Sequence, residues 1–351
     1  MVNSQIQKYN LDKLGNPEYF HEPIDIAQFP KKYYLKALKR MKLIRRAEEI
    51  LGDNVENDII KCPCHLSIGQ EAIPVGISKY LTKKDFVFGN HRSHGHYLSL
   101  SDDVHSLFAE TLGKKTGSSK GMGGSMHVIA KEDGFHGSVP IVSATIPVSV
   151  GAGLTSKLKK QGSISLSYFG DGASEEGTFH ESLNLAAYYK LPVLFVCENN
   201  LFSSHMHINE RQPYDSIGRF ANTHDIPCET IDGNNISEVF RVAEKAINLL
   251  RNGEGPFFIE AITYRWRGHV GPDENIDVGL RRKEDLDMWK KRDPIGRLEQ
   301  SLINNNVISK NEIASMNNKI ETVTIAAWEK AMNDPFPDLD QLTSTVYYEK
   351  I

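Results

Sequence analysis

Apolar residues recur along the chain at two different spacings, and these spacings predict its helices and strands. Residues 31–52 carry an apolar stripe at helical spacing, and residues 237–250 repeat it as an amphipathic helix. The segment GQEAIPVGISKYL, which begins at residue 69, favours a further helix. The stripe of the first helix consists of Leu35, Leu38, Met41, Ile44 and Ala47.

Short, continuous apolar runs in the middle of the chain predict buried strands. They occupy residues 164–169, 193–197 and 257–264, with a shorter candidate at 226–231, and residues 175–189 predict a helix between the first two. Strands that alternate with helices are typical of an α/β fold, a largely parallel sheet with helices on both faces. Ligands of such folds bind beyond the carboxyl ends of strands, so we expect the chemistry in the loops after residues 169, 197 and 264.

Composition and charge narrow the class of protein. Hydrophobic residues make up 40% of the 351 positions and charged residues 25%, which excludes a disordered chain, a coiled coil and a collagen. The formal net charge of -4 gives no reason to expect nucleic acid or a membrane as a partner. With no internal repeat or Gly/Ser linker, we predict one domain over residues 31–300, an N-terminal extension (1–30) and a C-terminal helical tail (301–351).

The N-terminus and the cysteines point to a cytoplasmic protein. The first twenty residues lack the apolar core of a signal peptide, and no run of about 18 uncharged apolar residues could span a membrane. Four cysteines in a chain of this length do not make a disulfide framework, so we expect reduced thiols. Cys62 and Cys64 are too close for a redox CxxC pair, and we interpret them as structural.

Two polar loops follow neighbouring predicted strands. GDGAS occupies residues 170–174, and ENNLF occupies residues 198–202, one helix and one strand later. In a parallel sheet this crossover brings the two strand ends side by side. The Asp171 carboxylate and the Asn200 amide oxygen are then expected to face the same space. Oxygen atoms are the ligands that Mg²⁺ prefers, so the pair predicts a magnesium site.

The same loop has the features of a diphosphate site. Gly170 and Gly172 allow a close approach of the backbone, and a helix expected to start near Ser174 would present free N–H groups to the anion. Taken separately, GDG is more often a tight turn and NN a cap. Their joint position around one crossover favours a metal-bridged diphosphate. The segment has neither the dinucleotide GxGxxG pattern nor the GK[ST] of a P-loop.

GDG followed by NN at this spacing resembles the signature of thiamine diphosphate enzymes. Further motifs stand in the order found in the α subunits of pyruvate, branched-chain 2-oxo acid and acetoin dehydrogenases, and the resemblance covers residues 30–300. It implies the thiamine-diphosphate-binding fold, with thiamine diphosphate and Mg²⁺ as cofactors. The motifs are IRRAEE (44–49), HLSIGQEA (65–72), HRSHG (91–95), KGMGGSMH (120–127) and YRWRGH (264–269).

The resemblance also implies roles for individual residues. Mg²⁺ would be held by the side chains of Asp171 and Asn200 and by the backbone carbonyl of Phe202, where the family usually has Tyr. Arg92 would pair with the diphosphate, while the residue before it, commonly Tyr in the family, is His91 here. The cofactor contacts implied for this chain are His91, Arg92, Pro140, Val142, Asp171, Gly172, Ala173, Asn200, Phe202 and His269.

Histidines supply the candidate catalytic groups. His65 and His269 match loop histidines of the family and are candidates for proton transfer or for binding the substrate carboxylate. Without the motif, a surface or packed histidine would be the simpler interpretation of either. The group His91, His94 and His96 has no acidic or cysteine partner at a usual spacing, and Arg92 lies inside it, so we do not favour a zinc site there.

The implied reaction is oxidative decarboxylation of a 2-oxo acid, or cleavage of acetoin, with transfer of the acyl group to a lipoyl acceptor. In the family, a β subunit supplies the glutamate that activates the cofactor, so we expect an obligate partner in an α₂β₂ heterotetramer, and a lipoyl acyltransferase is a further candidate partner. A carboligase or non-oxidative decarboxylase subunit is the alternative. A non-catalytic homologue would be expected to have lost Asp171 and Asn200, and both are present. Residues 203–215 depart from the family, which leaves the substrate open.

Overall fold

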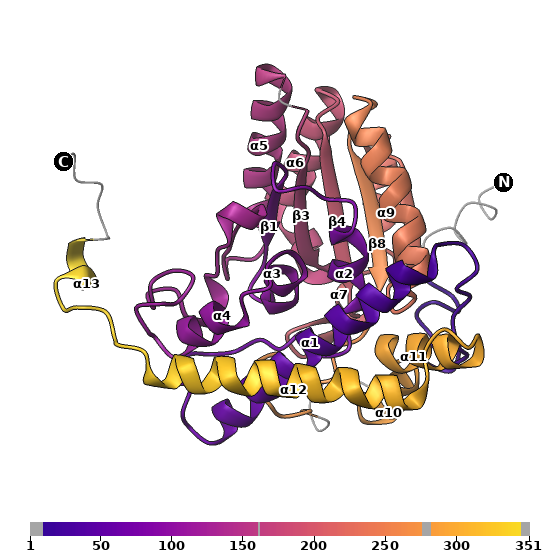
Figure 1. Ribbon diagram of the computed structural model, residues 1–351. Coiled ribbons are helices and arrows are strands. Elements are labelled where there is room, and N and C mark those ends of the chain that lie inside the picture. The colour runs from indigo at the N-terminus through magenta and orange to yellow at the C-terminus, as the bar shows by residue number, and fades with distance from the viewer. Residues whose placement is uncertain (1–9, 161, 276–281, 345–351) are drawn as a thin grey trace.

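A computed structural model describes residues 10–160, 162–275 and 282–344 (Figure 1). Within these residues, six strands form one parallel sheet in the order β2-β1-β3-β4-β8-β7. A short antiparallel hairpin, β5 (Phe202–Ser203) with β6 (Met206–His207), follows β4. The strands of the sheet are β1 (Phe86–Gly89), β2 (Phe135–Ser138), β3 (Ser165–Gly170), β4 (Val193–Asn199), β7 (Cys228–Asp232) and β8 (Phe257–Ile262).

Helices cover both faces of the sheet, with α5 and α6 on one side and α9 on the other in Figure 1. The α/β fold and the parallel sheet predicted from the sequence are confirmed. The helices in the described part of the chain are α1 (Lys31–Glu56), α2 (Ala72–Ser78), α3 (His94–Leu100), α4 (Val104–Thr111), α5 (Thr145–Lys159), α6 (Gly177–Tyr188), α7 (Ile208–Arg211), α8 (Gly218–Thr223), α9 (Ile236–Arg251), α10 (Arg282–Lys291), α11 (Pro294–Asn304), α12 (Lys310–Asn333) and α13 (Gln341–Ser344).

Strand β4 shows why the central strands read as continuous apolar runs. All its residues are buried, and their side chains alternate between two cores. Leu194 and Val196 pack in the core that contains α1, α2 and α9, whereas Phe195 and Cys197 pack in the core with α5 and α6. A strand covered on both faces needs apolar residues at every position, which removes the alternation of a half-exposed strand.

Strands β3 and β4 are direct neighbours, as the crossover argument predicts. They pair in parallel from Ser165 with Val193 to Gly170 with Glu198, and α6 connects them. The loops that begin at Asp171 and Asn200 therefore leave the sheet side by side. This adjacency places the two candidate metal ligands at the same edge.

Two predicted helices begin later than expected. Residues Asp171–Glu175 form a 3-10 turn, and Glu176 is extended, with φ −86° and ψ 140°, so α6 starts at Gly177 and not near Ser174. The helix expected from residue 69 is the short α2, because residues 67–70 form a turn closed by Gln70 N–H donating to the Ser67 carbonyl. In both places a residue before the helix, Ala173 or Gln70, lines the candidate site, and the regular helix begins only after it.

A buried carboxylate organises the glycine-rich segment 119–124. Glu110, in α4, accepts hydrogen bonds from four backbone N–H groups, with distances between 2.6 and 3.1 Å. Glu110 is fully buried, so these donors replace the water that its charge would otherwise require. The donors are Ser119, Gly121, Gly123 and Gly124.

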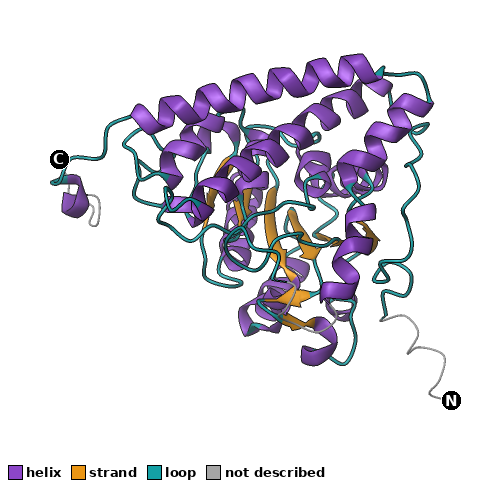
Figure 2. Ribbon diagram, turned by 90° about the horizontal axis from the view of Figure 1, so that it is seen from below, coloured by secondary structure: helices purple, strands orange, loops and turns teal. Residues whose placement is uncertain are grey.

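The long helix α12 packs against two helices from the N-terminal third of the chain. A capping box starts it, with Ser309 accepting from Glu312 N–H and Glu312 accepting from Ser309 N–H. The helix packs on α1 and α4, and Trp328 meets Phe108 edge to face, with ring centroids 5.4 Å apart. Figure 2 shows α12 along one side, with α13 away from the body. In the described residues, none of the helices has the length and apolarity needed to traverse a bilayer.

Candidate active site

A cavity opens at the carboxyl ends of the strands, where the loops after β1, β2, β3, β4 and β8 converge. The loops after residues 169, 197 and 264 are among them, as the fold argument expects. The structure brings ten of the candidate residues into the cavity wall, and Asp171 lies between Gly170 and Gly172, which both line it. The ten are His65, His91, Arg92, Pro140, Val142, Gly172, Ala173, Asn200, Phe202 and His269.

Asp171 is fully buried and has one oxygen available. Its Oδ2 is ion-paired with Arg211, which also pairs with Glu175, and its Oδ1 has no hydrogen-bond partner among the described residues. Burial raises the pKa of Asp171 above its ordinary value, and the charge of Arg211 opposes that rise. A buried carboxylate oxygen without a partner is costly unless a cation or a donor completes it.

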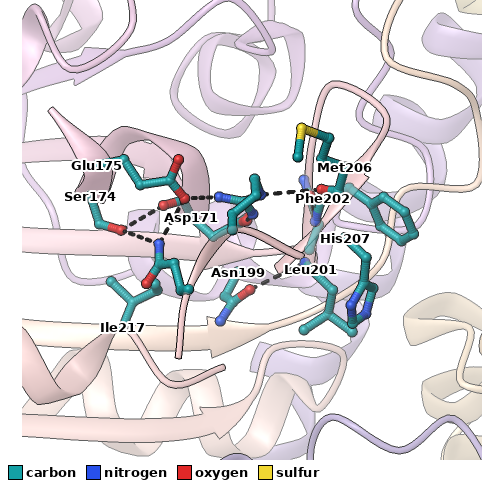
Figure 3. A network of polar contacts seen from close by, with 12 residues as sticks. Asp171, Ser174, Glu175, Asn199, Leu201, Phe202, Met206, His207 and Ile217 are labelled. Carbon is teal, nitrogen blue, oxygen red and sulfur yellow. Dashed lines mark hydrogen bonds and ion pairs between the residues drawn. The ribbon is translucent and has the colours of Figure 1, made fainter. Parts of the chain in front are cut away.

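Arg211 belongs to the segment 203–215, which departs from the family pattern. Gln212 from the same segment donates to Ser174 Oγ at 3.1 Å and to Glu175 at 2.8 Å. Figure 3 shows Asp171, Ser174 and Glu175 grouped at one side of this polar network. Through Arg211 and Gln212 the segment is thus bonded to the 3-10 turn that follows β3.

Asn200 presents its amide toward the same edge of the sheet. Its Nδ2 donates to Gln70 Oε1 at 3.1 Å, and its Oδ1 accepts from Phe202 N–H at 3.3 Å. The residue between, Leu201, has a positive φ of 68°, which turns the chain sharply after β4. Gln70 holds the Asn200 nitrogen, so the amide oxygen is the atom left on the side of Phe202.

The glycines of the turn leave room for a ligand. A Cβ at Gly170 would meet nothing within 4 Å, whereas a Cβ at Gly172 would lie 2.6 Å from Ser203 Oγ. Both positions line the cavity. Gly170 therefore leaves open space at the end of β3, and Gly172 allows the close approach of the β5 loop.

Two arginines give the cavity positive charge. Arg92 donates to the carbonyls of Leu66 at 2.7 Å and His269 at 3.1 Å. Arg265 contacts His269 Nδ1 at 3.3 Å and the carbonyl of Ser204. Burial lowers the pKa of Arg92 to about 10 and of Arg265 to about 9, so both remain cations at neutral pH.

Three histidines meet beside these arginines. The ring centroids of His65 and His91 are 4.6 Å apart, those of His65 and His269 4.9 Å, and those of His91 and His269 5.3 Å. Burial, followed by the charge of Arg92, lowers the pKa values of His65 to about 3, His91 to about 2 and His269 to about 4. At neutral pH all three are neutral imidazoles.

The other two histidines of the HRSHGH segment do not join His91. His94 is bonded through Nδ1 to Glu48 at 2.7 Å and through Nε2 to Ser125 Oγ at 2.8 Å. His96 pairs with Glu198 at 3.1 Å. Both histidines lie in α3. His96 thereby links α3 to the end of β4, and His94 links it to α1 and to the loop before His127.

Several wall residues were not assigned from the sequence. Arg265 stands inside YRWRGH and Gln70 inside HLSIGQEA, so their motifs were recognised without a role for the side chain. Ser203 and Ser204 lie in the segment that departs from the family, where no pattern pointed to them. The remaining unassigned wall residues include Asn90, Met126, Ser143, Thr145 and Glu198.

Comparison with known proteins gives one family over most of the chain. The sequence model of the dehydrogenase E1 component family matches residues 39–340. The pyruvate dehydrogenase E1 component subunit alpha of Rhizobium meliloti is 34% identical over 322 residues, which cover 92% of either chain. The subunit of the same name from Porphyra purpurea is 36% identical over 287 residues, 79% of this chain and 82% of its own.

A relative that is named for a different substrate has a similar identity to this chain. The alpha subunit of the acetoin:2,6-dichlorophenolindophenol oxidoreductase of Bacillus subtilis is 34% identical over 314 residues, 89% of this chain and 93% of its own. Identity to pyruvate and acetoin enzymes is thus nearly equal. Overall similarity does not separate the two substrates.

Proposed function

The chain belongs to the dehydrogenase E1 component family, and from this premise we propose that it is the α subunit of a thiamine-diphosphate- and Mg²⁺-dependent 2-oxo acid or acetoin dehydrogenase. The observation that carries the metal and diphosphate roles is the pair Asp171 and Asn200 at the ends of adjacent parallel strands. The relatives named above are dehydrogenases and an acetoin oxidoreductase, so they offer no support for a carboligase.

The residues at the strand ends fit a hard divalent cation. The unpartnered Oδ1 of Asp171, the Oδ1 of Asn200 and the Phe202 carbonyl would supply three oxygen ligands. Mg²⁺ takes few protein ligands and shares the rest of its octahedron with phosphates and water, which suits this small set. Phe in place of the family's Tyr changes nothing here, because the ligand is the backbone.

The two arginines of the cavity fit the diphosphate. Arg92 and Arg265 are buried cations, and each uses its guanidinium on backbone carbonyls while retaining further N–H donors. Helix α6 begins at Gly177, beyond the 3-10 turn, and its residues are not among those that line the cavity. We propose that Arg92, Gly172 and Ala173 hold the diphosphate, that His91 lies beside it, and that Pro140 and Val142 meet the aminopyrimidine with main-chain groups.

The histidines of the cavity are suited to hydrogen-bonding a substrate. His65 and His269 are neutral, so each can donate from one ring nitrogen and accept at the other. Thiamine diphosphate, when bound, supplies the carbanion-stabilising chemistry that decarboxylation requires. We propose that His65 and His269 orient the substrate carboxylate or carbonyl and move a proton at that position, while the surrounding burial excludes water.

The reaction requires a second chain. The family's activating glutamate belongs to a β subunit, and an α subunit implies such a partner. We propose an α₂β₂ assembly that passes its acyl group to a lipoyl acyltransferase. The chain alone should bind cofactor weakly and show no turnover, and adding its β chain should restore activity.

The experiment that tests the site uses the complex of this chain with the β chain that co-purifies with it. Native mass spectrometry in Mg²⁺ and thiamine diphosphate should show two cofactors per α₂β₂ assembly. Asp171→Asn should weaken cofactor binding at least about 100-fold by calorimetry, since even outer-sphere partners of a metal are worth about 10–100-fold. Glu175→Gln, which touches Arg211 but is no proposed ligand, should bind nearly as wild type. Unchanged affinity in Asp171→Asn would refute the metal role.

A further inference from the structure

The three cavity histidines come from separate segments and still converge on one point. His65 precedes α2, His91 follows β1 and His269 follows β8. One nitrogen from each ring can be chosen so that all three atoms lie within 4.8 Å of one another. The rings meet edge to face, at interplanar angles of 61–78°, and do not stack.

One of the three rings has a nitrogen without a partner in the described residues, whereas His269 Nδ1 contacts Arg265 at 3.3 Å. His65 is 7% exposed, and its Nδ1 has no partner within the described part of the chain, although it is buried. The lowered pKa values of the three rings keep them unprotonated at neutral pH. A neutral imidazole is the form that binds metal ions.

We propose that His65, His91 and His269 form a second metal site, for Zn²⁺ or a similar borderline ion, distinct from the oxygen site at Asp171 and Asn200. Three histidines with one open position are the ligand set of many zinc centres, whereas imidazole is a poor ligand for Mg²⁺. A tetrahedral site with Zn–N near 2.0–2.1 Å brings its nitrogens to roughly 3.3 Å apart, so the rings must close by about 1.5 Å.

The charges around the triad determine the fourth ligand. The cluster contains histidines alone, while Arg92 and Arg265 stand beside it, so a bare divalent ion would be repelled. An anion in the open position, such as phosphate or hydroxide, balances the metal and faces the two guanidinium groups. Arg265 has to release His269 Nδ1, a long contact of 3.3 Å, and is then free to bind that anion.

The site depends on one departure from the family pattern. His91 stands where the family commonly has Tyr, and with Tyr only two imidazoles would remain. The triad therefore depends on His91. Since it shares the cavity with the proposed diphosphate site, zinc bound there should oppose cofactor binding. The metal proposal itself rests on the three imidazoles and stands whether or not thiamine diphosphate binds.

The test uses the untagged full-length chain with Co²⁺ as a spectroscopic probe and phosphate as the anion. We expect one Co²⁺ per chain with the visible d–d bands of a four-coordinate site, displaced by one Zn²⁺. His91→Tyr should lower Zn²⁺ affinity at least about 100-fold, because loss of a residue that only hydrogen-bonds a metal ligand already costs about 10–100-fold. His224→Ala, outside the cavity, should bind as wild type. Equal unfolding midpoints of the variants establish that the loss is not misfolding.

Two further results decide the proposal. His269→Gln should abolish the four-coordinate spectrum, as His91→Tyr does. In the complex with its β chain, Zn²⁺ should weaken thiamine diphosphate binding in the wild type and not in His91→Tyr. A spectrum of an octahedral ion, or wild-type affinity in His91→Tyr, would overturn the site. If the Co²⁺ spectrum is present but thiamine diphosphate does not bind at all, the proposed function fails while the metal site remains.

Discussion

At the residue scale, the ion pair between Arg211 and Asp171 links a buried charge pair to the proposed metal site. Both side chains are almost fully buried, at 6% and 1% exposure, so each neutralises a charge that water cannot reach. Breaking a buried pair by removing one partner is far more costly than replacing both. A cation bound at Asp171 would perform the same neutralisation as Arg211.

Arg211→Gln is therefore expected to destabilise the cofactor-free protein by roughly 3 kcal/mol, since Asp171 loses its only charged partner in the described residues. Mg²⁺ with thiamine diphosphate should recover much of this loss. The rise in melting temperature on adding them should then be larger in the variant than in the wild type, by differential scanning calorimetry of the α–β complex. Arg211→Lys, which keeps the charge, should behave like the wild type, and equal shifts in all three proteins would contradict the argument.

The cavity histidines give stability a pH dependence of known sign. The pKa of His65 is about 3 in the folded chain, below its ordinary value of 6.5, so the unfolded chain binds more protons between these values. Stability is thus complete above about pH 6.5 and falls as the pH decreases. From about pH 7 to about pH 5, His65 alone should cost up to about 2 kcal/mol.

The measurement is the urea midpoint at both pH values for the wild type and His65→Asn. The variant should lose less stability on acidification, because one buried neutral imidazole is gone. His127→Asn, at an exposed position, serves as the matched control and should keep the wild-type pH dependence. Identical pH dependence in His65→Asn and the wild type would exclude the expected role of burial.

How much of the site the sequence predicts depends on where its residues stand. Asp171 and Asn200 follow strong strand signals, so their convergence can be argued from topology alone. The meeting of His65 with His269 cannot, because it requires the register of β8 against the loop before α2. Arg265 and Gln70 lay in recognised motifs, but only the folded chain shows that their side chains enter the cavity.

At the element scale, the elements predicted best from the sequence are helices with a long apolar stripe and strands that are continuous apolar runs. Helices α1 and α9 and strands β3, β4 and β8 were predicted near their true positions. Strands β1 and β2 have four residues each and no clear alternation, and α5 carries two glycines and a proline, so local signals were weak. Pairing of β1 with β3, pairing of β2 with β1 and packing of α5 on the sheet stabilise these elements, and all three are tertiary effects.

The loop around Glu110 offers a test of such tertiary organisation. Glu110→Gln replaces an acceptor-only carboxylate with an amide, whose NH₂ group faces N–H donors instead of accepting from them. We expect a loss of roughly 2–3 kcal/mol by urea denaturation and faster hydrogen exchange at residues 119–124. Glu132→Gln, at an exposed position, should stay within about 0.5 kcal/mol of the wild type. Unaltered exchange in the loop would show that Glu110 does not hold it.

At the scale of the whole molecule, the long helix α12 is part of the main core. Ala331 and Ile313 of α12 are buried in the core that also contains α1 and α9. Lys114 donates to the carbonyls of Met332 and Asp334, at 3.0 Å each, which fixes the end of the helix against the loop after α4. The sequence predicted a helical tail over residues 301–351, and within it α12 packs against α1 and α4.

Deletion of residues 309–351 should therefore expose Phe108 and the neighbouring core and lower the urea midpoint of unfolding. The full-length chain should unfold in a single transition. Deletion of residues 338–351 alone removes α13, which lies away from the body (Figures 1 and 2), and should leave the midpoint unchanged. Two separate transitions in the full-length chain would instead mark the tail as an independent unit. Circular dichroism and tryptophan fluorescence would both follow the change.

The strand order has a consequence for biosynthesis. Parallel neighbours in this sheet are distant in the chain, since Val87 pairs with Leu166 and Val196 with Ile259. Contacts of such long sequence separation form slowly, and β8 and the loop with His269 leave the ribosome late. A nascent chain has no complete cavity until most of the polypeptide has been translated. The cofactor can therefore stabilise the finished subunit but cannot act as a template during its synthesis.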